Sequence, residues 1–213
     1  MKYSETLGFR LTPVISLMLL NLVFFLITYF IGRAALFLGM TPDNFVSQPW
    51  TVITSMFIYA DFWHWLGVMI PLYFLGNMLL NRLGGGNFLA VYFFGGLAGN
   101  ILYLLLSLLA PGDYLAPILV SPSATMFAVG AVLIFIMGKQ KVRLLLIPSE
   151  IPLYVVVLMF FILLSLVRFS SWEANLGGLL FGLTAGYIIK VKKDRKEAWA
   201  IPSDSAEYDL PPR

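Results

Sequence analysis

Six long apolar stretches are the feature that most limits what this chain can fold into. A helix that crosses the hydrocarbon core of a bilayer needs roughly 20 mainly apolar residues, and about 17 are a workable minimum. Stretches of this kind, bounded by charged and turn-forming residues, lie at 11–31, 63–81, 88–109, 123–138, 151–167 and 174–191. Apolar residues make up 60% of the chain and charged residues only 12%, which is typical of a lipid-embedded protein. The sequence therefore predicts an all-α membrane protein with six transmembrane helices.

The basic residues predict how the helices are oriented, because lysine and arginine gather on the cytoplasmic side of a membrane. If the N-terminus is cytoplasmic, only Arg33 and Arg168 fall on the outer side. The basic residues on the inner side are Lys2, Arg10, Arg82, Lys139, Lys141, Arg143, Lys190, Lys192, Lys193, Arg195 and Lys196. Both termini are therefore expected in the cytoplasm, which requires an even number of spans.

This topology divides the chain into three expected parts: a cytoplasmic N-terminus at 1–10, a membrane domain at 11–191, and a disordered cytoplasmic tail at 192–213. The long connection at 33–62 is expected to pack at the outer membrane interface. Because the basic residues cluster at span ends, nucleic acid is not an expected partner. The chain has no cysteine, which excludes disulfides and thiolate chemistry, and we expect no metal and no cofactor. The expected location is the plasma membrane of a prokaryote.

Three polar residues share one depth in the predicted bundle. His64, Ser123 and Asn175 each lie near the start of a span that runs from outside to inside, and the rise of an α-helix is constant. Polar groups within a membrane are costly unless they are paired, so such a cluster indicates either a functional site or a satisfied structural network. For His64 alone, among its aromatic neighbours, a packing role is the more common one.

Small residues predict contact between two of the spans. The last span carries Gly178, Gly182 and Gly186 at intervals of four residues, and Ala124 and Ala128, together with Ala131, fall on one face of the fourth span. Helix backbones approach closely where such small residues face each other, although the pattern alone is common in membrane helices. We therefore expect helix packing that brings Ser123 toward Asn175.

Four segments, in order, resemble the rhomboid intramembrane serine protease superfamily. Residues 48–79 are similar to the rhomboid first outer loop and second span, and residues 92–100 to the third span. The stretch 121–124, SPSA, stands where rhomboids have their GxSG nucleophile motif, and the stretch 175–178, NLGG, stands where they have the catalytic histidine. The resemblance implies a six-helix bundle, a serine–histidine dyad without a metal, and transmembrane helices as substrates.

The chain departs from the rhomboid pattern at the chemically important positions. Ser123 is present, but Asn175 occupies the position of the histidine, and a carboxamide cannot take a proton from a serine. Ser121 and Ala124 replace the flanking glycines, Val68 replaces an asparagine of the oxyanion hole, and Thr51 replaces the arginine of a Trp-Arg pair.

These departures favour a pseudoprotease, which binds transmembrane helices within a lipid bilayer but does not cleave them. The alternative is an active intramembrane serine endopeptidase, in which Ser123 is the nucleophile and His64 or Glu173 acts as an unusual base. A small transporter or channel is a third hypothesis. It is disfavoured because the spans contain no buried aspartate, glutamate, lysine or arginine of the kind that marks an ion or proton pathway.

Overall fold

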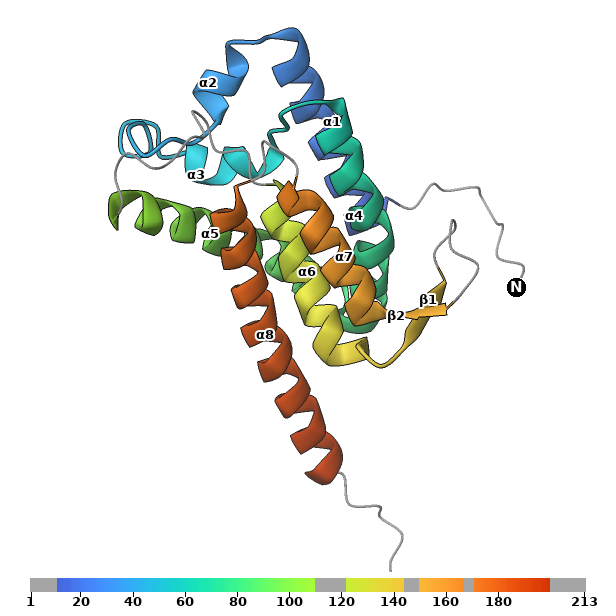
Figure 1. Cartoon of the computed structure of the whole chain (residues 1–213). Coiled ribbons are helices and arrows are strands. Elements are labelled where there is room, and N and C mark those ends of the chain that lie inside the picture. Colours follow the sequence, from blue (N-terminus) through green and yellow to red (C-terminus); the bar gives the residue numbers. More distant parts are fainter. Residues whose placement is uncertain (1–10, 110–121, 144–149, 167–170, 200–213) are drawn as a thin grey trace, which may run out of the picture.

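The computed structural model describes residues 11–109, 122–143, 150–166 and 171–199. Its elements are α1 (Pro13–Phe30), α2 (Ala34–Leu38), α3 (Thr51–Thr54), the 3-10 helix η1 (Ser55–Phe57), α4 (Phe62–Leu83), α5 (Gly85–Leu109), α6 (Pro122–Met137), β1 (Lys141–Arg143), β2 (Glu150–Pro152), α7 (Leu153–Leu166) and α8 (Trp172–Trp199). Each of the six predicted apolar stretches coincides with one helix, namely α1, α4, α5, α6, α7 and α8 (Figure 1). The prediction of a mostly helical chain is therefore confirmed.

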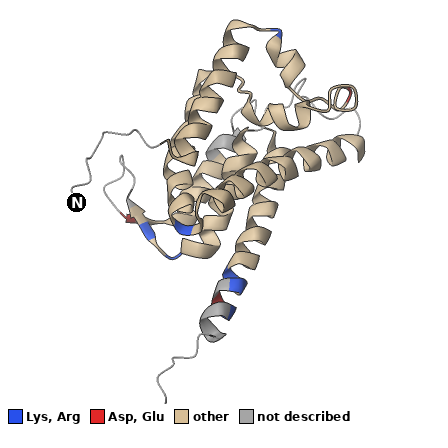
Figure 2. Ribbon diagram, turned by 180° about the vertical axis from the view of Figure 1, so that it is seen from behind, with Lys and Arg blue, Asp and Glu red and all other residues tan. Residues whose placement is uncertain are grey.

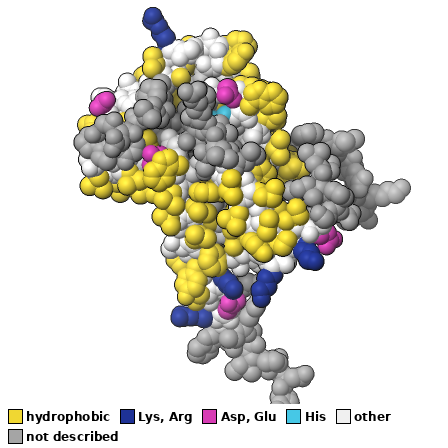
Figure 3. All heavy atoms as spheres, viewed as in Figure 1, with side chains coloured by type: hydrophobic (Ala, Val, Ile, Leu, Met, Phe, Trp, Pro, Cys, Tyr) yellow, Lys and Arg dark blue, Asp and Glu magenta, His cyan; other side chains and the backbone are white. Residues whose placement is uncertain are grey.

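Within the described residues, α1, α4, α5 and α8 are long and apolar enough to cross a membrane. The other two apolar helices, α6 and α7, are shorter. Figure 2 shows lysine and arginine mainly at the end of the molecule that holds β1 and the C-terminal half of α8. Hydrophobic side chains cover much of the surface between the two ends (Figure 3). This apolar surface is what a protein embedded in lipid requires.

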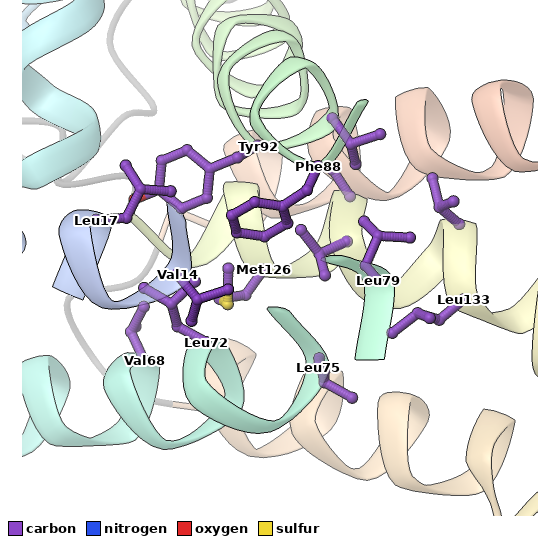
Figure 4. Packing of buried hydrophobic residues seen from close by; sticks show 14 of the residues in the cluster. Val14, Leu17, Val68, Leu72, Leu75, Leu79, Phe88, Tyr92, Met126 and Leu133 are labelled. Carbon is purple, nitrogen blue, oxygen red and sulfur yellow. The ribbon is translucent and has the colours of Figure 1, made fainter. Parts of the chain in front are cut away.

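The length of α6 is explained by its position in the bundle. Every residue from Pro122 to Leu133 is buried, and α6 packs against α4, α5, α7 and α8. Figure 4 shows the core beside it, where side chains of α1, α4, α5 and α6 converge; the labelled ones are Val14, Leu17, Val68, Leu72, Leu75, Leu79, Phe88, Tyr92, Met126 and Leu133. A helix enclosed by protein does not need a full hydrocarbon-spanning length of lipid-facing residues.

Local signals explain how the helices begin and end. The hydroxyl of Thr12 accepts a hydrogen bond from the backbone N–H of Ile15, and Pro13 occupies the first turn of α1, both of which are favourable at a helix start. Gly84 has a φ of 79° at the end of α4, a conformation that glycine adopts at little cost. The chain turns there and enters α5 at once.

The connection at 33–62 is ordered by its own short elements. The indole of Trp50 donates a hydrogen bond of 2.9 Å to the carbonyl of Phe37, and the hydroxyl of Thr54 donates one of 2.6 Å to the carbonyl of Leu38. The side chains of η1 are buried. These short helices were not predicted, because their contacts depend on residues far away along the sequence.

Two expectations need correction. The chain is not purely helical, because β1 and β2 form an antiparallel pair after α6. In addition, the tail predicted to be disordered from residue 192 begins as helix, because α8 continues to Trp199. Its segment 190–199 is rich in lysine, arginine, glutamate and alanine, which favour helix even outside lipid. The predicted N-terminus at 1–10, Arg168 and the tail at 200–213 lie outside the described residues.

Candidate functional site

The structure brings Ser123 and Asn175 into direct contact. The Oγ atom of Ser123 donates a hydrogen bond of 2.6 Å to Oδ1 of Asn175, and neither side chain is exposed. Ser123 lies in the first turn of α6 and Asn175 in the first turn of α8. Neither end of a carboxamide has a basic lone pair, so this partner orients the hydroxyl but cannot remove its proton.

Small residues allow α6 and α8 to approach this closely. A Cβ atom at Gly178 would collide with the carbonyl oxygen of Ala124, and one at Gly182 would collide with the carbonyl oxygen of Ala128. At Gly186 the nearest atom of the α6 backbone, the Cα of Val132, would lie 3.0 Å away. The glycines and alanines singled out in the sequence thus face one another. Their contact begins within one turn after the Ser123–Asn175 pair along both helices.

A third helix, α5, completes this close packing, and sequence reasoning missed its role. A Cβ atom at Gly99 would lie 2.6 Å from the carbonyl oxygen of Ala174 and 2.7 Å from the Cβ of Ala124. At Gly177 it would lie 2.7 Å from the carbonyl oxygen of Ala98. Ala174 immediately precedes Asn175, so α5 helps to set the position of Asn175. The four-residue interval from Gly95 to Gly99 was the signal that could have indicated this contact.

His64 is buried near the start of α4, but it is not hydrogen-bonded to Ser123. Asp61 caps the helix, since its carboxylate accepts a hydrogen bond of 2.7 Å from the backbone N–H of His64. The ring Nδ1 accepts a weaker one of 3.4 Å from the backbone N–H of Ala60. Nε2 has no hydrogen-bond partner among the described residues. With Nδ1 as acceptor, a neutral ring carries its proton on Nε2, so this atom is a donor and not a base.

The remaining residues that differ from the rhomboid pattern have structural surroundings of their own. Val68 is 1% exposed and belongs to the hydrophobic core. The hydroxyl of Thr51 donates a 2.6 Å hydrogen bond to the carbonyl of Gln48. Glu173 was expected just before the last helix, but it lies inside the first turn of α8 and is mostly buried. A carboxylate is favourable there because it faces the positive end of the helix dipole. Ser121 lies outside the described residues.

Two buried polar contacts hold the outer connection against the bundle, and neither was predicted. The side chain of Asn100 on α5 donates hydrogen bonds of 2.6 Å to the carbonyl of Val52 and 2.9 Å to the hydroxyl of Ser55. Next to them, the side chain of Met56 fills the space above Gly96. The segment of α3 and η1 is thereby fixed to the same helix that positions Asn175.

The second buried contact joins α1 to the outer connection and to α5. The hydroxyl of Tyr59 donates a hydrogen bond of 2.6 Å to Oδ1 of Asn21, and Nδ2 of Asn21 donates one of 3.2 Å to the hydroxyl of Tyr92. Burial, with a smaller effect of Tyr92, raises the pKa of Tyr59 well above its ordinary value, so its hydroxyl stays a donor at physiological pH. A lone asparagine within an apolar stretch was the available signal.

No metal centre is found in the ranges that the structure describes, where histidine and acidic side chains form no group of three or more that could hold an ion.

Comparison with known proteins agrees with this geometry. A model of the Rhomboid domain matches residues 46–192. Rhomboid protein 1, mitochondrial, from Saccharomyces cerevisiae is 27% identical over 165 residues, which cover 74% of this chain and 47% of the yeast protein. The match thus spans about half the length of that relative. Taken with the apolar helices, these matches show that the chain is an integral membrane protein that belongs to the rhomboid family.

Proposed function

We propose that this protein is a rhomboid pseudoprotease, which binds transmembrane helices of client proteins without efficiently cleaving them. The observation that carries the proposal is the buried 2.6 Å hydrogen bond from Oγ of Ser123 to Oδ1 of Asn175. A serine becomes a strong nucleophile only when a neighbouring base accepts its proton. Here the position next to the hydroxyl is filled by a group that accepts a hydrogen bond but cannot accept the proton.

A second part of the catalytic machinery, a hydrogen-bond donor of the oxyanion hole, is also missing near Ser123. Stabilisation of the oxyanion requires hydrogen-bond donors aimed at the developing charge, and removal of one donor typically costs about 100- to 1,000-fold in rate. Val68, which stands where rhomboids carry an asparagine, has no such donor. The two losses affect different groups in the same reaction, since the base activates the nucleophile and the donor stabilises the oxyanion.

Client binding is supported by the polar groups that remain. Ser123, Asn175 and His64 place hydrogen-bonding groups in apolar surroundings, where all three are buried, so a client helix would reach them where the helices around them separate. The exposed backbone of a locally unwound transmembrane helix needs such partners, because lipid offers none. A bundle that has lost its base can therefore still recognise and shelter a client helix.

The proposal includes a topology and a location. The six apolar helices form the membrane domain at 11–191, with both termini in the cytoplasm, because this arrangement leaves most basic residues on the inner side. The same bias is consistent with the plasma membrane of a prokaryote. The yeast relative, by contrast, is named as a mitochondrial protein.

Covalent labelling by a fluorophosphonate probe tests the missing base. The purified full chain is compared with Ser123→Ala and Asn175→His, and Asn77→His serves as a matched control for the introduction of a histidine elsewhere in a membrane helix. We expect no labelling of the native protein or of Asn77→His, and labelling in Asn175→His. Labelling of the native protein that disappears in Ser123→Ala would refute the proposal.

Client binding is tested separately by photo-crosslinking in native membranes. A photoreactive amino acid is introduced at Trp172, which is 55% exposed at the start of α8, or at Tyr187, which is 58% exposed farther along the same helix. We expect crosslinks to membrane-spanning proteins at Trp172 and far fewer at Tyr187. Equal crosslinking at both positions would indicate random encounters in the bilayer.

One observation bears on the alternative, an active endopeptidase with an unusual base. His64 is the sole histidine, and its buried Nε2 has no hydrogen-bond partner in the described part of the chain. To act as a base through Nε2, the ring would have to carry its proton on Nδ1, which is the opposite tautomer to the one that the Ala60 contact favours. If His64 served as the base, the native protein would be labelled, and His64→Gln would abolish the labelling. The structure disfavours this role because His64 makes no hydrogen bond to Ser123.

A further inference from the structure

Six exposed basic side chains gather at one end of the molecule. They come from the last turn of α4, from the turn after α6, from the start of β1, and from the C-terminal half of α8. Figures 2 and 3 show lysine and arginine at this end, opposite α2 and α3. We call this group the basic rim, and its members are Arg82, Lys139, Lys141, Lys190, Lys192 and Arg195.

The positive charge of the basic rim is not neutralised within the described structure. None of its members forms an ion pair with another described residue. The nearest chain segments contribute two exposed carboxylates, Glu150 and Asp194. Arg82 donates a long hydrogen bond of 3.4 Å to the neutral amide of Gln140, which ties the end of α4 to the segment before β1. A surplus of cationic groups therefore remains available to an outside partner.

The basic rim lies where the apolar surface ends. The apolar part of α8 ends at Lys192, and the exposed side chains directly before it include Tyr187 and Ile188. Arg82 likewise occupies the last turn of the apolar helix α4. In a bilayer, groups at this level meet the phosphates of the lipid headgroups, while the long stems of lysine and arginine still cover apolar surface.

The opposite end of the molecule differs in charge. Its described lysine, arginine, aspartate and glutamate residues are Arg33, Asp43, Asp61 and Glu173, which together carry more negative than positive charge. An attraction for anions is thus confined to one end. Helix α8 continues as helix through 190–199, so its cations project from a defined scaffold and not from an irregular tail.

We infer that the basic rim binds the headgroups of anionic phospholipids, and that it holds an annulus of such lipids around one end of the bundle. The occupant is identified by charge complementarity and by the continuity of the rim with the lipid-facing surface. Each basic group near an anionic membrane surface is expected to raise the local concentration of anionic lipid by about fivefold at most, and salt weakens the effect.

Spin-labelled lipids measure this selectivity directly. The full chain is reconstituted in phosphatidylcholine vesicles that contain a trace of spin-labelled phosphatidylglycerol or spin-labelled phosphatidylcholine. The ratio of the motionally restricted fractions gives the preference for the anionic lipid. We expect a ratio clearly above one at low salt that falls toward one at high salt, because screening weakens the attraction between the rim and the headgroups.

Variants distinguish an effect of the basic rim from an effect of the protein's net charge and from an effect of misfolding. Lys139→Gln with Lys141→Gln, and Lys190→Gln with Lys192→Gln, should each lower the ratio several-fold. The charge-conserving pair Lys139→Arg with Lys141→Arg, and Arg33→Gln at the opposite end, should leave it unchanged.

The inference is overturned by a native ratio near one, by a ratio insensitive to salt, or by an equal loss of preference in Arg33→Gln. Displacement of the labelled lipid by inorganic phosphate in the aqueous phase would also overturn it, because it would identify a soluble phosphate as the ligand.

Discussion

The replacement of Gly178 by alanine offers the most direct measurement of how tightly α6 and α8 are packed. The added Cβ would collide with the carbonyl oxygen of Ala124, and it would lie 2.8 Å from its carbonyl carbon and 3.1 Å from its Cα. These are backbone atoms, so no side-chain rotation can relieve the collision. An ordinary contact begins at 3.4 Å, so the carbonyl carbon alone requires a local separation of about 0.6 Å, the difference between 3.4 and 2.8 Å, and the nearer carbonyl oxygen requires more.

A separation of this size has a calculable cost. A gap of roughly 0.5–1 Å forfeits a quarter to a half of the dispersion energy of each contact, and the loss extends along the interface to Gly182 and Ala128. Overpacking of a well-packed site costs about 1–3 kcal/mol. We expect a loss near the upper end, because the atoms that the added Cβ meets are all backbone atoms of Ala124.

The free energy of unfolding is measured by titration of detergent-solubilised protein with sodium dodecyl sulfate, followed by circular dichroism. The control is Gly86→Ala in the first turn of α5, where an added Cβ would meet nothing within 4 Å. This control should be neutral or stabilising by up to about 1 kcal/mol, because alanine favours helix. Equal stability of Gly178→Ala and the native protein, or equal destabilisation by the control, would refute the reasoning.

Three further predictions concern buried contacts. In a double-mutant cycle, Ala128→Gly should rescue the stability lost in Gly95→Ala, with a coupling of about 1–2 kcal/mol. The Cβ added at position 95 would collide with the Cβ of Ala128, whereas the Cα of Ala128 would lie 3.7 Å away. Additive free energies of unfolding would contradict this prediction. Tyr59→Phe should cost about 1–3 kcal/mol in the same denaturation assay, because Oδ1 of the buried Asn21 loses its donor, and an unchanged stability would count against the network. Asn100→Ala should make α3 and η1 susceptible to limited proteolysis while the rest of the chain stays protected, whereas an unchanged cleavage pattern would show that apolar packing alone holds the segment.

The helical framework could be predicted because lipid imposes a simple rule. A chain in hydrocarbon must satisfy its backbone internally, and long apolar stretches therefore become helices. The spacing of small residues led to the contact between Ser123 and Asn175, since glycines at four-residue intervals align on one helix face. Apolar stretches and glycine intervals can both be read locally in the sequence. The structure has a helix at each apolar stretch and a close contact between helices at the glycines.

The missed features depend on contacts between distant segments. Nothing local indicates that Asn100 binds the backbone carbonyl of Val52. The asparagine within the apolar stretch of α1 signals a buried polar contact, but it does not identify Tyr59 and Tyr92 as the partners. The extent of α8 was underestimated for a different reason. Its charged segment was assigned to a tail by polarity, although lysine, glutamate and alanine are also strong helix formers.

The packing of α8 has a consequence for the biogenesis of the protein. Asn175 follows Ser123 by 52 residues, and chains are synthesised from the N-terminus. Until α8 enters the bilayer, the Ala124–Ala128 face of α6 is not covered by the glycines of α8, and Ser123 does not have its hydrogen bond to Asn175. During this interval any other transmembrane helix with a row of small residues can compete for the same face, so the rate of insertion of the last helix determines how often the bundle closes on itself.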